Sequence, residues 1–255
     1  MLLAMMWVVL VAAAAVAGGM NALAGGGTLV TFPSLLAFGM SPVAANATST
    51  VALVPGGVGG FWGFRHDVAG DRRELLWMAA PSLVGGALGA LLVLWVGNRT
   101  FARVVPWLIY GATLLFVAQA PIRRFIDRRI GADGHKRRRA LQVVAQFAIS
   151  IYGGFFGAAM GILMLAMLGL VGHDNLSRMN GLKNFAGVAI NLTAAAIFAA
   201  SGQVHWQVAL AMMGGSVVGG YAAARASRHV NPMWVRALVI VTGVVMGTYT
   251  LVKAM

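Results

Sequence analysis

Apolar runs long enough to cross a bilayer recur from one end of this chain to the other, and no other feature constrains the fold more. A membrane-spanning helix needs roughly 17–25 mostly apolar residues. The runs do not alternate between polar and apolar residues as the strands of a membrane barrel do. Only 10% of the 255 residues are charged, whereas soluble domains average about 25%. The sequence therefore predicts an all-α polytopic membrane protein surrounded by the lipid bilayer.

Charged breaks divide the chain into ten hydrophobic segments, near 2–24, 28–40, 43–64, 75–97, 104–122, 140–157, 158–172, 179–200, 207–224 and 233–252. The second and seventh segments are too short to span comfortably, and each follows or contains a glycine-rich stretch. We expect them to be half-helices or re-entrant pieces. The first run lacks a basic start and a clear cleavage site, which favours a membrane segment over a removable signal peptide.

The chain also repeats itself. A shift of 134 residues aligns SLVGG at 82–86 with SVVGG at 216–220, and the same shift pairs Asn46 with Asn180. Chance similarity among glycine- and alanine-rich helices is the alternative. Because one offset serves matches spread over a whole half, we predict two repeats of about five segments each. The predicted division is a first repeat, a linker and a second repeat, at 1–122, 123–139 and 140–255.

The distribution of Lys and Arg predicts how the repeats are oriented. The linker 123–139 holds eight basic residues and should face the cytoplasm. Two inverted repeats then place sixteen Lys and Arg inside and three outside, whereas reading 140–172 as one crossing gives twelve and seven. We therefore expect inverted repeats with eight or ten spans, in the cell (inner) membrane, and both termini outside the cytoplasm. The net charge of +13 lies mostly in these loops, so we expect no nucleic-acid partner.

Few residues suit catalysis or metal binding. All six acidic residues fall in loops or at segment ends, so a proton or sodium site built on a carboxylate is not expected. His173 and His205 lie at segment edges, where interfacial anchoring is the simpler role. There is no cysteine, no HExxH and no GxSxG motif. The sequence predicts neither an enzyme nor a cofactor, and it leaves a homo-oligomer open.

Two stretches of the first half carry polar or flexible residues at membrane depth. In AGGGT (24–28), three consecutive glycines favour a helix break, and the half-helix that follows could hold an anion at its positive end. Close helix packing is the alternative for these glycines. In SPVAANATSTVALVPGG (41–57), Asn46, Thr48 and Ser49 crowd one or two turns. Pro55 should kink or unwind this segment, while hydroxyl groups that bond only to their own turn are the simpler reading.

The counterpart in the second half is RMNGLKNFAGVAINLTAAAIFAA (178–200). The offset pairs Ser49 with Lys183, which lies between Asn180 and Asn184. An ammonium costs roughly 2.5–3.5 kcal/mol at the centre of a membrane helix. Lys183 could extend its stem to the interface, or it could supply positive charge for an anionic substrate, which would offset that cost.

At these motifs the chain resembles the sulfite exporter TauE/SafE family, also called the toluene sulfonate uptake permease family. The resemblance runs over nearly the whole chain and implies a permease for sulfite, organosulfonates or related anions. The family pattern points to Gly25, Gly26, Gly27, Asn46, Thr48, Asn180, Lys183 and Asn184. The second half departs from the triple glycine and reads GAAMG, so the two halves are expected to bind substrate unequally.

Together these features predict a secondary transporter for a small sulfur-containing or organic anion, in which two inverted halves rock about a midplane site. An anion channel and a non-transporting scaffold remain as alternatives. The candidate substrate-binding residues are Gly25, Gly26, Gly27, Asn46, Thr48, Ser49, Asn180, Lys183 and Asn184.

Overall fold

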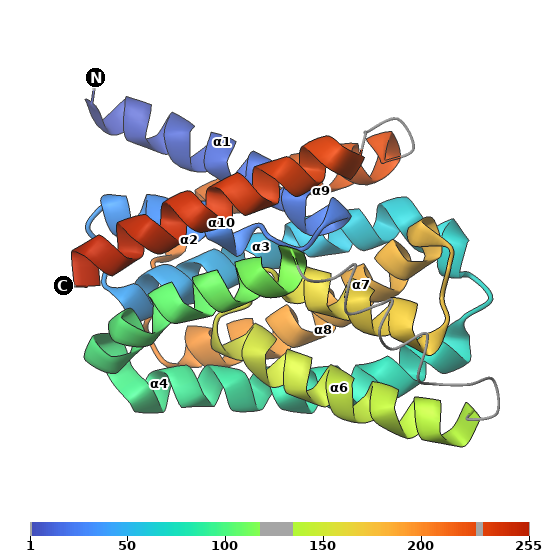
Figure 1. Cartoon of the computed structure of the whole chain (residues 1–255). Helices are drawn as coiled ribbons and strands as arrows, with labels where there is room; N and C mark the ends of the chain where they lie inside the picture. Colours follow the sequence, from blue (N-terminus) through green and yellow to red (C-terminus); the bar gives the residue numbers. More distant parts are fainter. Residues whose placement is uncertain (1, 118–134, 228–231, 255) are drawn as a thin grey trace.

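A computed structural model describes residues 2–117, 135–227 and 232–254, and the regular structure among them is helical (Figure 1). The helices are α1 (Leu2–Leu23), α2 (Thr28–Ala37), α3 (Pro42–Phe64), α4 (Arg72–Val117), α6 (His135–Phe155), α7 (Met160–Val171), α8 (Leu176–Ala200), α9 (Trp206–Ala226) and α10 (Pro232–Ala254). A short 3₁₀ turn, η1 (Arg65–Val68), joins α3 to α4. The predicted all-α class is confirmed.

Several helices match the dimensions of a bilayer. Within the described residues, four stretches are long and apolar enough to cross a membrane by length and composition, namely Met5–Leu23, Arg72–Gly111, Leu176–Ala200 and Trp206–Ala226. Shorter apolar helical stretches lie at Thr28–Ala37, Met160–Gly169 and Ile240–Val252. With 10 and 12 residues, α2 and α7 are about 15 and 18 Å long. A hydrocarbon core is about 30 Å thick, so neither short helix spans it alone, as the sequence predicted.

α2 turns back along α1 instead of continuing it. The N–H of Gly27 donates to Asn21 Oδ1 at 2.7 Å, so the start of α2 lies beside the last turn of α1. Further along α2, the hydroxyl oxygen of Thr31 lies 2.5 Å from that of Ser49 in α3. Because a loop of only four residues joins α2 to α3, α2 runs antiparallel to α3. Helices α1 and α2 thus form a hairpin, and residues 24–27 are called the first tip below.

α6 and α7 form a second hairpin, with residues 156–159 as the second tip. Glu74 at the start of α4 binds both Arg139, in the first turns of α6, and His173, just after α7. The beginning of α6 and the end of α7 therefore lie together, and the tip lies at the far end of both helices. Figure 1 shows both tips near the middle of the bundle.

The two halves run in opposite directions. Arg178 at the start of α8 binds Asp71, just before α4, so α4 and α8 begin at the same end of the bundle, and Glu74 and Arg139 add α6 to that end. Chain connectivity then makes α3, which ends there, and α9, which follows α8, run the opposite way. Gly215 and Gly219 of α9 pack on Val11 and Ala15 of α1 in the same order, so α1 is parallel to α9. Hence α1 opposes α6, and α3 opposes α8.

The helix boundaries follow the 134-residue offset. Pro42, the first residue of α3, corresponds to Leu176, the first of α8, and Arg72 of α4 corresponds to Trp206 of α9. Packing follows the same exchange, because α1 packs on α9 as α6 packs on α4, and α3 packs on α9 as α8 packs on α4. The fold therefore consists of two inverted repeats whose long helices interlock. The domain limits at 122 and 139 fall in or beside residues outside the described ranges and stay predictions.

Of two local expectations, the break after 75–97 is present, and the unwinding at Pro55 is not. The segments expected at 75–97 and 104–122 are joined in α4, which is interrupted only at Gly97 (φ 72°, ψ 174°). The chain turns back sharply there (Figure 1), so the two arms of α4 correspond to the two segments. α3 stays helical through Pro55 rather than unwinding, since a proline in a membrane helix is tolerated where neighbouring groups satisfy the freed carbonyl.

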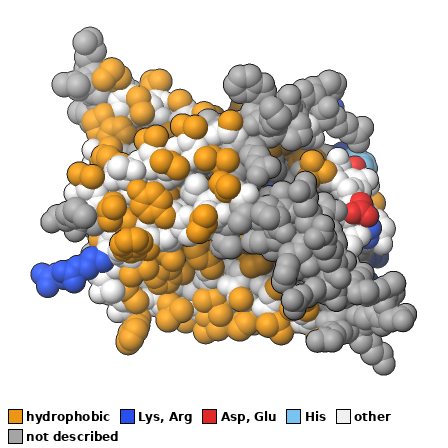
Figure 2. Space-filling model, viewed as in Figure 1, with side chains coloured by type: hydrophobic (Ala, Val, Ile, Leu, Met, Phe, Trp, Pro, Cys, Tyr) orange, Lys and Arg blue, Asp and Glu red, His pale blue; other side chains and the backbone are white. Residues whose placement is uncertain are grey.

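The outer surface fits a lipid environment. Large apolar side chains are exposed along the long helices, including Leu76 (73%) and Trp95 (84%) of α4 and Leu210 (61%) of α9. Figure 2 shows apolar side chains covering the described middle of one face, with the charged ones at its two ends. The start of α1 and the end of α10 both lie at the left of the bundle in Figure 1. Most of the basic linker lies outside the described residues.

Candidate functional site

The first tip contacts the first turn of α7 through glycine backbone. Gly25 has φ +86°, and a Cβ added there would lie 2.3 Å from Gly161 Cα. A Cβ at Gly161 would in turn lie 2.6 Å from Gly25 Cα. Only glycine allows both the left-handed conformation and this approach. The break predicted at AGGGT is therefore confirmed, and its first glycine packs directly on the second hairpin.

The second tip is built differently. Gly157 (φ 74°) and Ala159 (φ 60°) both adopt left-handed conformations. Ala159 thus takes a conformation that glycine would adopt with less strain than alanine does. The Tyr152 hydroxyl donates to the Ala158 carbonyl at 2.5 Å and ties the tip to α6. The departure of GAAMG from the triple glycine thus changes the chemistry of the tip without removing the break.

Lys183 is buried at the first tip. Its side chain is 2% exposed, and its Nζ donates to the Asn21 and Ala22 carbonyls, both at 2.9 Å. Asn184 Nδ2 donates to the same Ala22 carbonyl at 3.2 Å. These carbonyls belong to the C-terminal end of α1, where a helix carries partial negative charge. The lysine stem therefore does not extend to the interface, and the ammonium neutralises the end of α1.

Asn46 has the corresponding role at the second hairpin. Its Nδ2 donates to the Phe155 carbonyl, at the last residue of α6, at 3.1 Å. Phe155 is the offset partner of Asn21, whose carbonyl accepts from Lys183. Each long central helix, α3 or α8, therefore caps the hairpin of the other half. One cap is a neutral amide and the other a cation, so the two caps differ in charge.

The C-terminal ends of α1 and α6 are both capped. The N-terminal ends of α2 and α7 therefore dominate the electrostatic potential between the tips. Gly26 and Gly27 lead into α2, and a Cβ at Gly157, just before α7, would lie 3.8 Å from Thr28 Oγ1. Several of the first N–H groups donate to carbonyls of the tips, among them those of Leu29 and Met160, and the helix dipole adds positive potential at each N-terminal end. Two positive helix ends and one ammonium thus converge in the interior.

A cavity of about 30 Å³ lies beside Lys183. That volume accommodates about one or two water molecules and no larger anion, so the site is closed in this conformation. The cavity is lined by Asn21, Gly25, Gly57, Met160, Gly161, Met164, Lys183, Asn184, Gly187, Val188 and Asn191. It brings together three of the predicted site residues, Gly25, Lys183 and Asn184.

The other predicted residues do not line this cavity. Thr48 accepts from the His205 N–H at 3.1 Å, and Ser49 pairs with Thr31 of α2. Asn180 is 4% exposed. Its Oδ1, like that of Asn46, has no hydrogen-bond partner among the described residues. Two buried amide oxygens at offset-related positions therefore remain available to a donor.

Sequence reasoning missed Asn21, Gly161 and Asn191 as site residues. Asn21 holds the Gly27 N–H through its side chain and accepts from Lys183 through its backbone. An amide four residues before a glycine break was a usable signal, because such a side chain can reach the amide groups freed by the break. Gly161 carried a signal as well, since it is the offset partner of Gly27.

The described carboxylates lie at one end of the bundle, away from the tips. Arg178 donates to Asp71 through Nε and a terminal nitrogen at 2.6 and 2.5 Å. Glu74 accepts from Arg139 at 3.2 Å and from Gln142. In the described ranges, no group of three His, Cys, Asp or Glu side chains could hold a metal ion. These ion pairs fasten the starts of α4, α6 and α8 together.

Comparisons with known proteins agree with this architecture. The family model described as Sulfite exporter TauE/SafE matches residues 10–250. A "Probable membrane transporter protein" of Haemophilus influenzae is 29% identical over 236 residues, covering 91% of this chain and 89% of its own. The "Probable membrane transporter protein YfcA" of Escherichia coli K12 is 27% identical over 238 residues, covering 91% and 85%. The "Probable membrane transporter protein ORF9" of a Sinorhizobium species is 28% identical, covering 88% and 85%.

No solved structure gives a significant match. The family match nonetheless extends from α1 to α10 and includes both tips, Lys183 and the interlocked long helices. This multi-pass membrane protein therefore belongs to the sulfite exporter TauE/SafE family of membrane transporters.

Proposed function

We propose that the protein is a secondary transporter for a small anion, with sulfite, organosulfonates and related sulfur-containing or organic anions as the substrate class. One observation carries the proposal: the N-terminal ends of the short helices α2 and α7 converge near a buried lysine. Broken helices that meet at mid-depth, with half-helix N-termini near the substrate, are a recurring design of transporters. The proposal assigns no enzymatic step and no cofactor.

The proposed binding residues keep the set predicted from sequence, with roles refined by the contacts. Lys183 would supply positive charge, and Asn184 would supply amide donors beside it. Gly26 would present its backbone N–H at the start of α2. The N–H groups of Gly25 and Gly27 donate to the Met20 carbonyl and to Asn21 Oδ1, so these two glycines would contribute by releasing those bonds when substrate enters. Asn46, Thr48, Ser49 and Asn180 would complete the shell around the tips. In the closed state, Lys183 donates two hydrogen bonds to carbonyls of α1. We propose that the substrate accepts hydrogen bonds from Lys183 in place of these carbonyls when the tips separate.

Alternating access follows from the inverted repeats in this proposal. The cavity is too small for a multi-atom anion, so binding requires the tips to move apart. The contact of Gly25 with Gly161 is made by backbone atoms, which favours such a movement. We place the starts of α4, α6 and α8 on the cytoplasmic side of the inner membrane, because most described basic residues lie at that end.

An anion channel is the second candidate, and it requires a continuous polar path that these closed tips do not favour. The two classes differ in flux. A transporter loaded with unlabelled anion accelerates uptake of the labelled anion and saturates with concentration, whereas a channel shows neither counter-exchange nor saturation in the same range. A scaffold that does not transport gives no flux at all.

The decisive experiment is a binding screen on the purified full chain against sulfite, an aromatic sulfonate, sulfate and a carboxylate of similar size. We expect at least one sulfur oxyanion to bind saturably and to raise the unfolding temperature, because a ligand that binds only the folded state stabilises it. Absence of binding to every anion, in protein that is folded and monodisperse, would remove the proposed function.

A further inference from the structure

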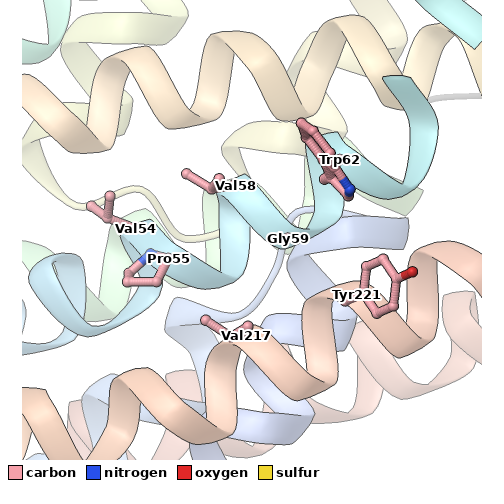
Figure 3. A pocket seen from close by; sticks show the side chains of 7 residues that line it. All are labelled: Val54, Pro55, Val58, Gly59, Trp62, Val217 and Tyr221. Carbon is pink, nitrogen blue, oxygen red and sulfur yellow. The ribbon is translucent and has the colours of Figure 1, made fainter. Parts of the chain in front are cut away.

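An open groove lies on the outer face of the molecule between α3 and α9 (Figure 3). Its volume is about 490 Å³, within the roughly 300–1,000 Å³ of small-molecule sites. Val54, Pro55 and Val58 of α3 line one side, and Val217 of α9 lines the other. None of its lining residues belongs to the cavity beside Lys183, so the groove is a separate feature.

The shape of the groove comes from a missing side chain. Gly59 has no Cβ, and one added there would lie 3.3 Å from the Val217 carbonyl oxygen. From Val54 to Trp62 the groove follows α3 for about 12 Å. Val58 and Trp62 are 46% and 57% exposed on its wall. An open, largely apolar groove of this length matches part of a hydrocarbon chain rather than a polar ligand.

One end of the groove is polar and positively charged. The Arg65 guanidinium lies over the Trp62 ring, 4.6 Å from its centroid, and donates to the Trp62 carbonyl at 2.7 Å. The Arg225 guanidinium lies over the Tyr221 ring at 5.6 Å and donates to its hydroxyl at 3.1 Å. Trp62 and Tyr221 also line the groove. Each arginine is thus held beside the groove by an aromatic residue that forms its wall.

The two arginines lie at the same level and remain available to an anion. α3 and α9 end side by side, because a Cβ at Gly63 would lie 2.4 Å from Ala224 Cβ. Within the described part of the chain, neither Arg65 nor Arg225 forms an ion pair with a carboxylate. A guanidinium has five N–H donors and binds phosphate through two of them at once. Only one hydrogen bond from each guanidinium is used here.

We propose that this groove binds one anionic phospholipid, with an acyl chain along Val58 and Val217 and the phosphate between Arg65 and Arg225. Charge complementarity selects the occupant. An apolar groove that ends in an aromatic pair and two arginines, neither bound to a carboxylate among the described residues, matches the order of chain, interface and headgroup in a lipid. A zwitterionic lipid would fill the groove equally well but would bring a cation to the two arginines. The site is independent of the proposed transport activity.

The test is mass spectrometry of the intact full chain in detergent, with equal amounts of dioleoyl phosphatidylglycerol and dioleoyl phosphatidylcholine. We expect phosphatidylglycerol to bind about ten- to thirtyfold more tightly, because each basic residue near an anionic lipid contributes about 1 kcal/mol and 1.4 kcal/mol is about a factor of ten. The double variant Arg65→Gln/Arg225→Gln should bind both lipids alike. The control Arg99→Gln/Arg103→Gln removes two exposed charges at the other end of the bundle and should keep the preference.

A second variant tests the groove itself. Val58→Trp fills the groove at an exposed position, so folding should be unaffected, and binding of both lipids should fall at least about fivefold.

An unchanged preference in the arginine variant would overturn the proposal. So would displacement of the lipid by millimolar inorganic phosphate, because the arginines would then bind phosphate without the chain. A dimer that Val58→Trp converts to a monomer with unaltered lipid binding would assign the groove to a second copy instead.

Discussion

Among single residues, Lys183 has the greatest effect on the chemistry of the interior. Its ammonium is buried between α8 and the end of α1, where it donates to two backbone carbonyls. Asn46 meets the same need at the other hairpin with a neutral amide. A neutral donor therefore suffices to cap such a helix end. The extra charge at the first tip needs another reason, and attraction of an anion supplies one.

The first prediction concerns this charge. Lys183→Met should weaken binding of the best anion at least about tenfold, because a charge-assisted hydrogen bond is worth about 1.5–3 kcal/mol and 1.4 kcal/mol is about a factor of ten. It should also lower the unfolding temperature, since the carbonyls of Asn21 and Ala22 lose a donor. Binding is measured by calorimetry and unfolding by scanning fluorimetry. Arg99→Met, at an exposed position, is the control and should change neither quantity.

Equal affinity in the Lys183 and control variants would mean that the lysine is only a cap, and that any anion site consists of backbone and amide groups. The sequence identified Lys183 as an exception because it interrupts an apolar segment. It could not identify the partners, which lie 162 and 161 residues away and are backbone oxygens. Every residue has a carbonyl oxygen, so residue types do not mark the ones left open at the end of a helix.

Among the elements, the two hairpins matter most, and glycine backbone decides how closely they approach. Three consecutive glycines made the first break predictable. The second break was harder, because Ala159 adopts a left-handed conformation that alanine rarely takes. The break between the segments at 75–97 and 104–122 was predicted from the charged residues between them, but its exact position at Gly97 was not, since single glycines are common in membrane helices. Tertiary packing decides which of these glycines bends the chain.

The second prediction concerns the contact between the first tip and α7. Gly25→Ala places a Cβ 2.3 Å from Gly161 Cα and forces an alanine to φ +86°. The left-handed conformation costs about 1–2 kcal/mol and overpacking about 1–3 kcal/mol, so the unfolding temperature and transport rate should both fall. Gly214→Ala, on the exposed side of α9 with no neighbour within 4 Å, is the matched control. Equal loss in both variants would contradict the tight contact.

In the whole molecule, interlocked antiparallel halves put like elements at opposite ends. The sequence predicted the all-α class, the short second and seventh segments and the repeat offset, because apolar periodicity and glycine breaks are local signals. The interlocking of α1 with α9 and of α6 with α4 could not be predicted, since it depends on contacts between small residues far apart in the chain. Sidedness in the membrane follows from charge and stays a prediction.

The third prediction tests which end of the bundle faces the cytoplasm. The sequence contains no cysteine, so a single introduced cysteine is the only thiol that a labelling reagent can modify. Gly70→Cys lies in the exposed turn before α4, and Arg99→Cys is exposed just after the Gly97 turn at the other end. A membrane-impermeant maleimide applied to intact cells should label position 99 and reach position 70 only after lysis. Labelling with the opposite preference would reverse the orientation, and equal labelling of both positions would contradict a fixed topology.

The inversion of the two halves has a consequence for how the chain enters the membrane during synthesis. Arg72 and Arg73 at the start of α4 correspond to Trp206 and Gln207 at the start of α9, and across the whole sequence no Lys or Arg of one half falls on a Lys or Arg of the other at the 134-residue offset. The insertion machinery orients helices by such charges. The two halves share one architecture but present the insertion machinery with opposite charge signals. On the proposed topology, a basic residue at the same offset position in both halves would favour the wrong orientation for one of them.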